Sequence, residues 1–118
     1  TLLNTEADPF WDVCQRHNVA AVNAAPYGSG MLAKGPKAYP RYMYSEASEN
    51  MLARAMRIEA ICQQHDVPLA AAALQFSLRD PRIVSTVGGV TRPERLNETV
   101  ALAQFPIPHE LWAAIATV

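Results

Sequence analysis

The chain has 118 residues, half of them apolar and 18% charged, and its ten basic and eleven acidic residues leave a net charge of −1. This length allows one domain, residues 1–118, and a composition this apolar and this close to neutral excludes a disordered chain. It also disfavours a non-specific nucleic-acid binder, which would carry a basic excess, and no apolar run approaches the roughly 20 residues that cross a bilayer.

A short apolar segment, a helix and a strand are the first elements that the sequence predicts. The apolar segment lies within residues 1–4. Thr5 and Asp8 then give the Thr-x-x-acid spacing of a helix N-cap, and residues 8–17 follow with apolar side chains at helical spacing. Residues 19–22, Val-Ala-Ala-Val, have no polar alternation, which is typical of a strand that is buried on both faces.

Residues 24–44 predict a long loop. Six glycines and prolines break any helical period in this stretch, and a loop this long in a compact domain is more often functional than not. Residues 28–33 fit the G-x-G-x-x-A outline of a dinucleotide-binding turn, but Lys34, Gly35 and Pro36 follow where that fingerprint needs a helix. We therefore reject a Rossmann fold and expect a glycine-rich loop whose backbone approaches an anionic ligand closely.

Two helices, a strand and two more helices are predicted beyond the loop. The first helix begins near Ser45 or Ser48 and runs to about residue 64, and an alanine-rich helix follows it and ends at Asp80-Pro81. Residues 83–87, Ile-Val-Ser-Thr-Val, are typical of a strand because four of the five are β-branched. The first of the last two helices should carry Leu96, Val100 and Ala103 on one side, and Leu111, Trp112 and Ile115 suggest a short final helix.

The order of these elements predicts an α/β fold in which parallel strands are joined by helices that cover the sheet. Only three strands are expected: the first apolar segment, residues 19–22 and residues 83–87. At least one edge of the sheet is therefore left unprotected. The chain therefore looks like part of a larger α/β structure, and its first residue, Thr1 rather than Met, leads us to expect residues upstream. An open edge also pairs with any complementary backbone, so self-association is a second way to cover it.

The clearest anion-binding pattern lies at residues 88–95. The strand ends in Gly88-Gly89, and residues 91–94 form a capping box with a proline in the first turn, so a helix N-terminus points at whatever lies above the strand. Arg92 and Arg95 add positive charge on the same side. An ordinary strand-to-helix turn with two solvated arginines explains these residues equally well. Both glycine loops fall at the carboxyl end of the sheet, where parallel α/β folds bind ligands.

Two Cys-x-x-His pairs, at residues 14–17 and 62–65, hold the ligand types of a zinc site. Both pairs lie where a helix is expected to end, and the usual Cys-x-x-Cys spacing is absent, so we predict that the chain binds no metal. Two cysteines also form no disulfide framework, which predicts the reducing cytoplasm. No nucleophile elbow, phosphate-binding lysine loop or Ser/His/Asp set is recognisable, so we predict no catalytic residue.

Three segments together resemble the C-terminal part of an aldo-keto reductase: Val22–Leu32, Ala73–Leu78 and Val87–Thr99. The nearest branch of that family oxidises L-fucose or D-threo-aldoses and includes pyridoxal dehydrogenases. The resemblance covers essentially the whole chain and implies the C-terminal portion, about three βα units, of a (β/α)₈ barrel, whose full length needs about 250 residues. It assigns the end of the sixth strand to residues 1–4, the seventh strand to 19–25 and the eighth to 83–87.

The resemblance also implies a nicotinamide cofactor, NADP or NAD, at the carboxyl end of the barrel. The positions that match the family's cofactor-binding segments are Tyr27, Gly28, Ser29, Gly30, Gly89, Val90, Thr91, Arg95 and Glu98. Ala24 stands where many members place a tyrosine under the nicotinamide ring, Gly89 replaces a lysine and Thr99 replaces an asparagine. The last two departures weaken a preference for NADP, Arg92 or Arg95 could compensate for them, and both cofactors remain open.

The family's catalytic Asp, Tyr, Lys and His come from earlier strands, and no residue of this chain matches them. The resemblance therefore implies a fragment of an NAD(P)-dependent oxidoreductase that interconverts an aldehyde or sugar hemiacetal with its alcohol or lactone. Such a fragment is expected to be inactive unless the missing N-terminal half of the barrel is supplied, and its substrate would be a small-molecule carbonyl or sugar. The alternative is a non-catalytic α/β module that binds an anionic ligand or associates with itself through the open sheet edge.

Overall fold

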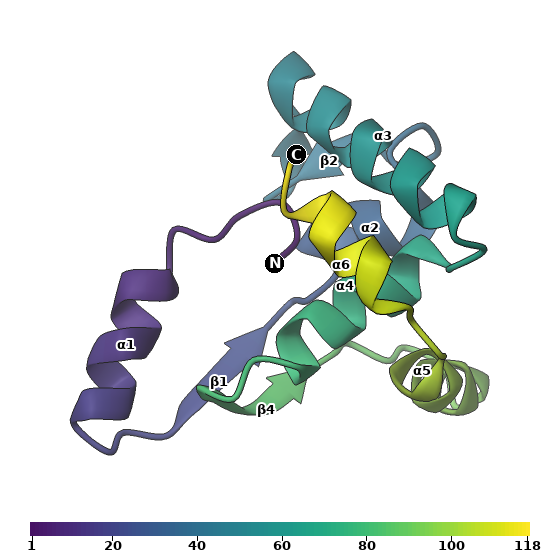
Figure 1. Ribbon diagram of the computed structural model, residues 1–118. Coiled ribbons are helices and arrows are strands. Elements are labelled where there is room, and N and C mark those ends of the chain that lie inside the picture. The colour runs from purple at the N-terminus through teal and green to yellow at the C-terminus, as the bar shows by residue number, and fades with distance from the viewer.

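Six α-helices, a parallel strand pair and a small hairpin make up the computed structural model, which describes residues 1–118 (Figure 1). In chain order the elements are α1 (Asp8–Arg16), β1 (Ala21–Ala24), a 3-10 helix (Gly28–Gly30), α2 (Met31–Lys34), β2 (Arg41–Tyr42), β3 (Ser45–Glu46), α3 (Glu49–Gln64), α4 (Leu69–Leu78), β4 (Ile83–Val87), α5 (Glu94–Gln104) and α6 (His109–Ile115). None of the helices combines the length and the apolar character needed to cross a bilayer.

The two longer strands, β1 and β4, lie side by side and run parallel, as the sequence predicts. Val22 stands opposite Ser85 and Ala24 opposite Val87, with an irregularity in the register after Ala21. Between β1 and β4 the chain passes through α3 and α4, which is the helical crossover that joins parallel strands. Parallel pairing brings the segments that follow both strands to one end of the sheet.

Residues 1–4 do not form the strand that was expected of them. The Asn4 N–H donates to the Thr1 carbonyl at 3.1 Å, and the Thr1 amino group donates to the Asn4 carbonyl at 2.9 Å, so the segment closes into a turn. A strand needs a neighbour along its length to accept its hydrogen bonds, whereas these residues satisfy one another. Leu2 and Leu3 are only 2% exposed and belong to the main core.

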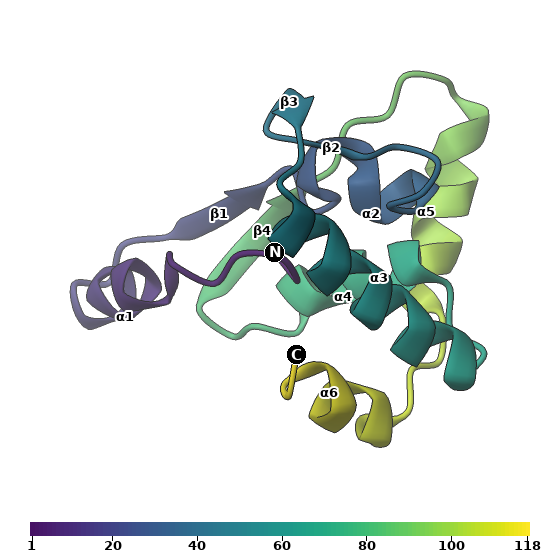
Figure 2. The same ribbon diagram turned by 90° about the horizontal axis from the view of Figure 1, so that it is seen from above.

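The main core lies among the helices rather than around the sheet (Figure 2). Its largest fully buried side chains come from the first residues and from α2, α3 and α6: Leu2, Met31, Leu32, Ile58 and Leu111. The face of α4 that meets them is built from alanines, whose small side chains let neighbouring helices approach closely. The stable centre of residues 1–118 is therefore a helix cluster.

The prediction that the strands are buried on both faces is wrong for this chain. Asn23 of β1 and Thr86 of β4 both hydrogen-bond the buried Ser77 hydroxyl on α4, at 2.8 and 2.7 Å, so this face of the sheet is covered. Side chains alternate along a strand, and Val22 and Val87, on the opposite face, are 50% and 55% exposed. Within residues 1–118 no element packs over that opposite face, which is why it stays open.

The long loop holds more structure than its glycines and prolines suggested. It contains the 3-10 helix, the four-residue helix α2 and the hairpin of β2 and β3. Gly30 and Gly35 flank α2 with φ of 105° and 88°, left-handed values that glycine adopts without steric cost. These breakers set the ends of short elements and do not prevent them from forming.

Helix starts agree only partly with the capping patterns. The Ser48 hydroxyl accepts the Met51 N–H at 3.3 Å, so Ser48 caps α3 as one of the two predicted candidates. Neither Thr5 nor Thr91 acts as a cap, because α1 and α5 begin after Ala7 and Pro93 without a side-chain hydrogen bond. Helix α1 nevertheless begins at Asp8, as the apolar spacing of residues 8–17 predicts, so there only the capping residue is wrong.

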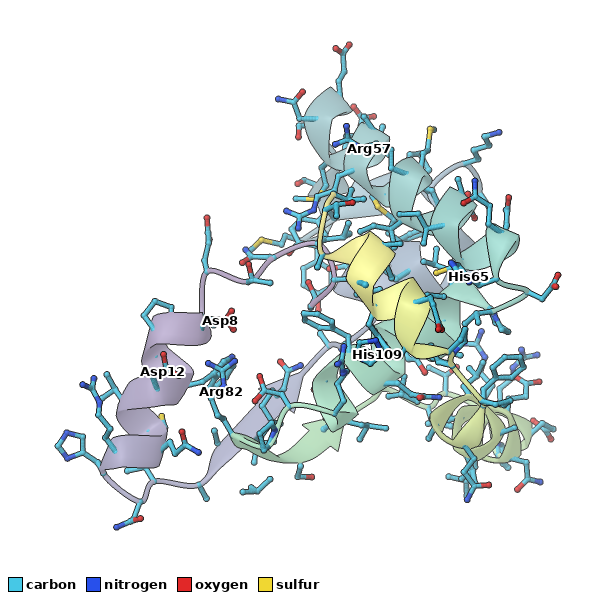
Figure 3. All side chains as sticks on the ribbon, viewed as in Figure 1. Asp8, Asp12, Arg57, His65, Arg82 and His109 are labelled. Carbon is cyan, nitrogen blue, oxygen red and sulfur yellow. The ribbon has the colours of Figure 1, made fainter.

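Helix α1 stands apart from the helix cluster and is tied to the body by Arg82 (Figure 3). The guanidinium donates to Asp12 at 2.8 Å and to Asp8 at 3.1 Å, both on α1, and its other N–H groups contact Asp80 at 2.6 to 3.2 Å. These hydrogen bonds hold the pKa of the Asp80 carboxyl below its ordinary value and raise that of Arg82. We call Arg82 and these three aspartates the arginine cluster.

Candidate functional site

A cavity of about 530 Å³ lies where the loops after β1 and β4 meet. Cavities of this size are typical of sites for small molecules and cofactors. The segment after β1 contributes Ala25, Pro26, Tyr27, Ser29, Gly30, Ala33 and Lys34, the segment after β4 contributes Gly89, Thr91, Arg95, Glu98, Thr99 and Leu102, and Tyr44 and Ala70 complete the wall. The structure thus brings together the two glycine loops that the sequence singled out.

Seven of the nine predicted cofactor-binding residues line this cavity. They are Tyr27, Ser29, Gly30, Gly89, Thr91, Arg95 and Glu98. The other two lie outside it: Gly28 is buried against Leu3 and Tyr42, and Val90 is 41% exposed. The difference arises because neighbours along an irregular loop point in different directions, which a linear motif does not encode.

The loop after β1 turns sharply through residues with positive φ. Gly28, Ser29 and Gly30 have φ of 54°, 58° and 105°. The Gly28 N–H donates to Ala25 at 3.1 Å and the Gly30 N–H donates to Tyr27 at 3.1 Å, so these two amides are used within the loop itself. Ser29 and Gly30 line the cavity, so the loop backbone does border it, and the close approach to an anionic ligand stays a prediction.

The turn after β4 leaves open space beside the cavity. A side chain built at Gly88 or Gly89 would meet no atom within 4 Å, and neither glycine has a φ that disfavours a side chain. Of the two arginines nearby, Arg95 lines the cavity and Arg92 does not. The predicted pair of charges is therefore reduced to Arg95 on this side of the site.

One face of α5 forms a wall of the cavity. Arg95, Glu98, Thr99 and Leu102 follow one another at the i, i+3, i+4 and i+7 spacing that places residues on the same side of a helix. The Thr99 hydroxyl donates to the Arg95 carbonyl at 2.8 Å. Burial raises the pKa of the Tyr27 phenol, and the Thr99 side chain and the Arg95 charge partly oppose that rise, so the two walls of the cavity interact.

Sequence patterns missed two residues that the structure adds to the site. Lys34 lies at the end of α2, with its amino group 4.3 Å from the centre of the Tyr39 ring, and supplies a second cation. Tyr44 lies at the tip of the β2–β3 hairpin, 86% exposed, and reaches the cavity wall. The signal for Lys34 was its place just after the glycine loop, where it was taken only as an argument against a helix.

The Cys-x-x-His pairs do not meet. His17 and His65 are the C-caps of α1 and α3, and both cysteines are buried free thiols. Burial raises the pKa of the Cys62 thiol to about 11. No three His, Cys, Asp or Glu side chains gather closely enough to hold one metal ion.

The groups around the cavity favour a ligand that combines negative charge with hydroxyl groups. Two cations, Lys34 and Arg95, can pair with an anion, and the Glu98 carboxylate can accept hydrogen bonds from ligand hydroxyls. No histidine of the chain lines the cavity. The site therefore has binding groups but lacks the side chain that most often transfers protons near neutral pH.

Comparison with known proteins gives consistent matches over the whole chain. The family model described as Aldo/keto reductase family matches residues 1–118. D-threo-aldose 1-dehydrogenase of Pseudomonas sp is 40% identical over 104 residues, which are 87% of this chain and 32% of that protein. Pyridoxal 4-dehydrogenase of Microbacterium luteolum is 35% identical over 106 residues, which are 90% of this chain and 31% of that protein. The chain spans about a third of the length of these relatives.

Solved structures show the same likeness at the level of the fold. The holo form of the aldo-keto reductase AKR11C1 from Bacillus halodurans matches with a TM-score of 0.75 at 19% identity, over 98% of this chain and 39% of that chain. The apo form of the same protein matches with a TM-score of 0.70 at 20% identity, over 98% of this chain and 40% of that chain. At this identity the match establishes the fold.

Proposed function

Because the chain belongs to the aldo/keto reductase family and its fold is the C-terminal portion of the family's (β/α)₈ barrel, we propose that residues 1–118 form the cofactor-binding part of a longer oxidoreductase. The whole protein interconverts an aldehyde or sugar hemiacetal with its alcohol or lactone, using NADP or NAD. The names of the two relatives, an aldose dehydrogenase and a pyridoxal dehydrogenase, support a small carbonyl or sugar substrate. The two free cysteines fit a place in the reducing cytoplasm.

The observation that supports this proposal best is the meeting of two separate glycine segments at one cavity. The glycine loop at residues 28–33 and the turn at residues 88–95 were singled out as separate patterns, and residues of both line the same cavity. The surroundings of Gly89 support the proposal independently of the family. The space into which a side chain would project there is open, so a ligand can lie against the backbone. A dinucleotide needs such an approach to backbone along its length.

Each wall has groups suited to one part of a nicotinamide dinucleotide. Arg95 and Lys34 would pair with its phosphates, and Glu98 would accept hydrogen bonds from a ribose hydroxyl. The bound cofactor supplies hydride transfer at its nicotinamide ring, and this chain orients the cofactor. None of the residues of this chain belongs to the proton relay. We therefore propose that the relay lies in the remainder of the barrel.

Replacing Gly89 tests the proposed site. Gly89→Leu should weaken binding of NADPH and NADH at least tenfold, because the new side chain fills the space along which the cofactor would lie. The measurement is titration of reduced-cofactor fluorescence with the full-length protein that carries this sequence. Gly88→Leu is the matched control, since Gly88 has equally open surroundings but does not line the cavity. Equal and slight effects of the two changes would mean that the glycines make only a structural turn.

One observation favours the alternative of a self-associating module. The uncovered face of the β1–β4 pair exposes Val22 and Val87, and an apolar strand pair with open edges can associate with another copy. Light scattering on residues 1–118 alone separates the two proposals when it is combined with the missing barrel half. A dimer that the added half does not dissociate supports the module, whereas assembly with that half into an active reductase supports the barrel.

A further inference from the structure

Helix α5 forms a wall of the cavity, and its C-terminal end packs against the main core through the partly buried Leu102 and Phe105. None of its residues is buried, and Leu96 and Val100, which lie on one side of the helix, are 57% and 48% exposed. Figures 1 and 2 show α5 at the edge of the molecule, beside α4. The beginning of α5 has no such apolar contact, so the groups at its C-terminal end fix the position of this helix.

The main polar contact comes from Gln75 on α4. Its side-chain amide donates to the Leu102 carbonyl at 2.8 Å and to the Phe105 carbonyl at 2.8 Å. The last carbonyls of a helix have no partner within the helix, so one amide group satisfies two of them where α5 ends. Both hydrogens of that amide are used, and two bonds to different acceptors restrain rotation as well as distance.

Gln75 itself is held on the most buried helix of the chain. Its neighbours Ala73, Leu74 and Ser77 are all buried, and Ser77 is further fixed by its hydrogen bonds to β1 and β4. The amide is therefore attached to a rigid support that also holds the strand pair. Through Gln75 and Ser77, α4 therefore fixes α5 relative to β1 and β4, and the segments that follow these strands supply the rest of the cavity wall.

The contact at the end of α5 bears directly on the cavity face of the helix. Leu102 lines the cavity, and Arg95 lies seven residues before it, which is two helical turns and nearly the same angle around the helix. If the end of α5 rotates or tilts, Arg95 and Glu98 move away from the ligand. Displacements of about 1 Å are enough to weaken a positioned contact substantially.

We propose that Gln75 is a positioning residue for the cofactor site: it anchors the C-terminal end of α5 so that Arg95 and Glu98 face the cavity. Gln75 does not line the cavity. The inference rests on the proposed function, because the ligand whose binding it controls is the nicotinamide dinucleotide. Gln75, on the crossover helix α4, would thus control the affinity for the cofactor although it lies in neither glycine loop.

Gln75→Met keeps the length of the side chain and removes both donors. In the full-length protein it should raise the Kd for NADPH or NADH about tenfold, because ligand binding must then supply the free energy, about that of two hydrogen bonds, that had held α5 in place. The KM for substrate at saturating cofactor should stay unchanged. Gln75→Lys, which restores a donor that can reach the same carbonyls, should recover a large part of the affinity. If the Met variant does not fold, Gln75→Asn, one methylene too short to reach both carbonyls, replaces it with the same expected loss.

Ile58→Val provides the control for a general loss of stability, since Ile58 is fully buried in the helix core and does not line the cavity. At an equal fall in Tm it should leave the Kd unchanged. If Gln75→Met and Ile58→Val alter the Kd alike, Gln75 acts only on stability and the inference is overturned. If the unaltered protein binds neither NADPH nor NADH, the proposed function fails instead, so the two failures are distinct.

Discussion

The helix cluster and the β1–β4 strand pair use apolar residues in opposite ways. In the helix cluster, Ile58, Leu111 and Met31 are completely buried, whereas Val22, Val84 and Val87 of the strands are half exposed or more. An ordinary barrel strand would be the most buried part of an α/β fold. The difference teaches that residues 1–118 bury their helices against one another but cover only one face of their strands. The cavity lies where these two regions meet.

The largest expected effect separates the two regions by their contribution to stability. Ile58→Ala should lower the free energy of unfolding by about 2–5 kcal/mol, because it removes buried methyl groups and leaves a cavity in the helix cluster. Val87→Ala should change it by less than about 0.5 kcal/mol in residues 1–118, because Val87 lies on the uncovered face and is 55% exposed. Chemical denaturation of both variants measures the contrast. Comparable losses would mean that the strand pair is covered in solution, either by a second copy of the chain or by a segment from outside residues 1–118.

The arginine cluster is the attachment between α1 and the rest of the chain, so its loss should affect one region only. Arg82→Met removes the guanidinium hydrogen bonds to Asp8, Asp12 and Asp80, keeps the one from its backbone N–H to Asp80, and should cost about 1–3 kcal/mol of local stability. Hydrogen exchange should speed up at the amides of α1, whose one buried residue is Cys14, and stay unchanged in α3. Faster exchange in both helices would contradict the separation of the two regions.

The smallest effect is a pH dependence that comes from the same cluster. Hydrogen bonds from Arg82 lower the pKa of the folded-state Asp80 carboxyl below its ordinary value of 3.8. The stabilisation is therefore complete above that value and is lost as the pH falls through the lower folded-state pKa. Denaturation curves taken on both sides of this range should show the loss in the unaltered chain and a smaller loss in Arg82→Met. Identical pH profiles would show that the Asp80–Arg82 hydrogen bonds contribute no pH-dependent stability.

The sequence predicted the local elements well because each depends on residues close together in the chain. Ser48 caps α3, Asp80-Pro81 follows the end of α4, and the β-branched run 83–87 forms β4. The glycine segments after β1 and β4 were likewise recognisable, since a turn needs few residues. What a pattern could not give was the direction of each loop side chain, which is why Gly28, Val90 and Arg92 lie outside the cavity while Lys34 and Tyr44 reach it.

The composition and the local patterns by themselves determined an α/β chain with parallel strands and two glycine turns at one end. Only the tertiary structure decided that Leu2 and Leu3 join the helix cluster, that one face of the strands stays open, and that Gln75 and Arg82 reach partners 27 to 74 residues away. The physical reason is range. Propensities and turns depend on neighbours along the chain, whereas burial and hydrogen bonds between elements depend on which surfaces meet when the whole chain packs.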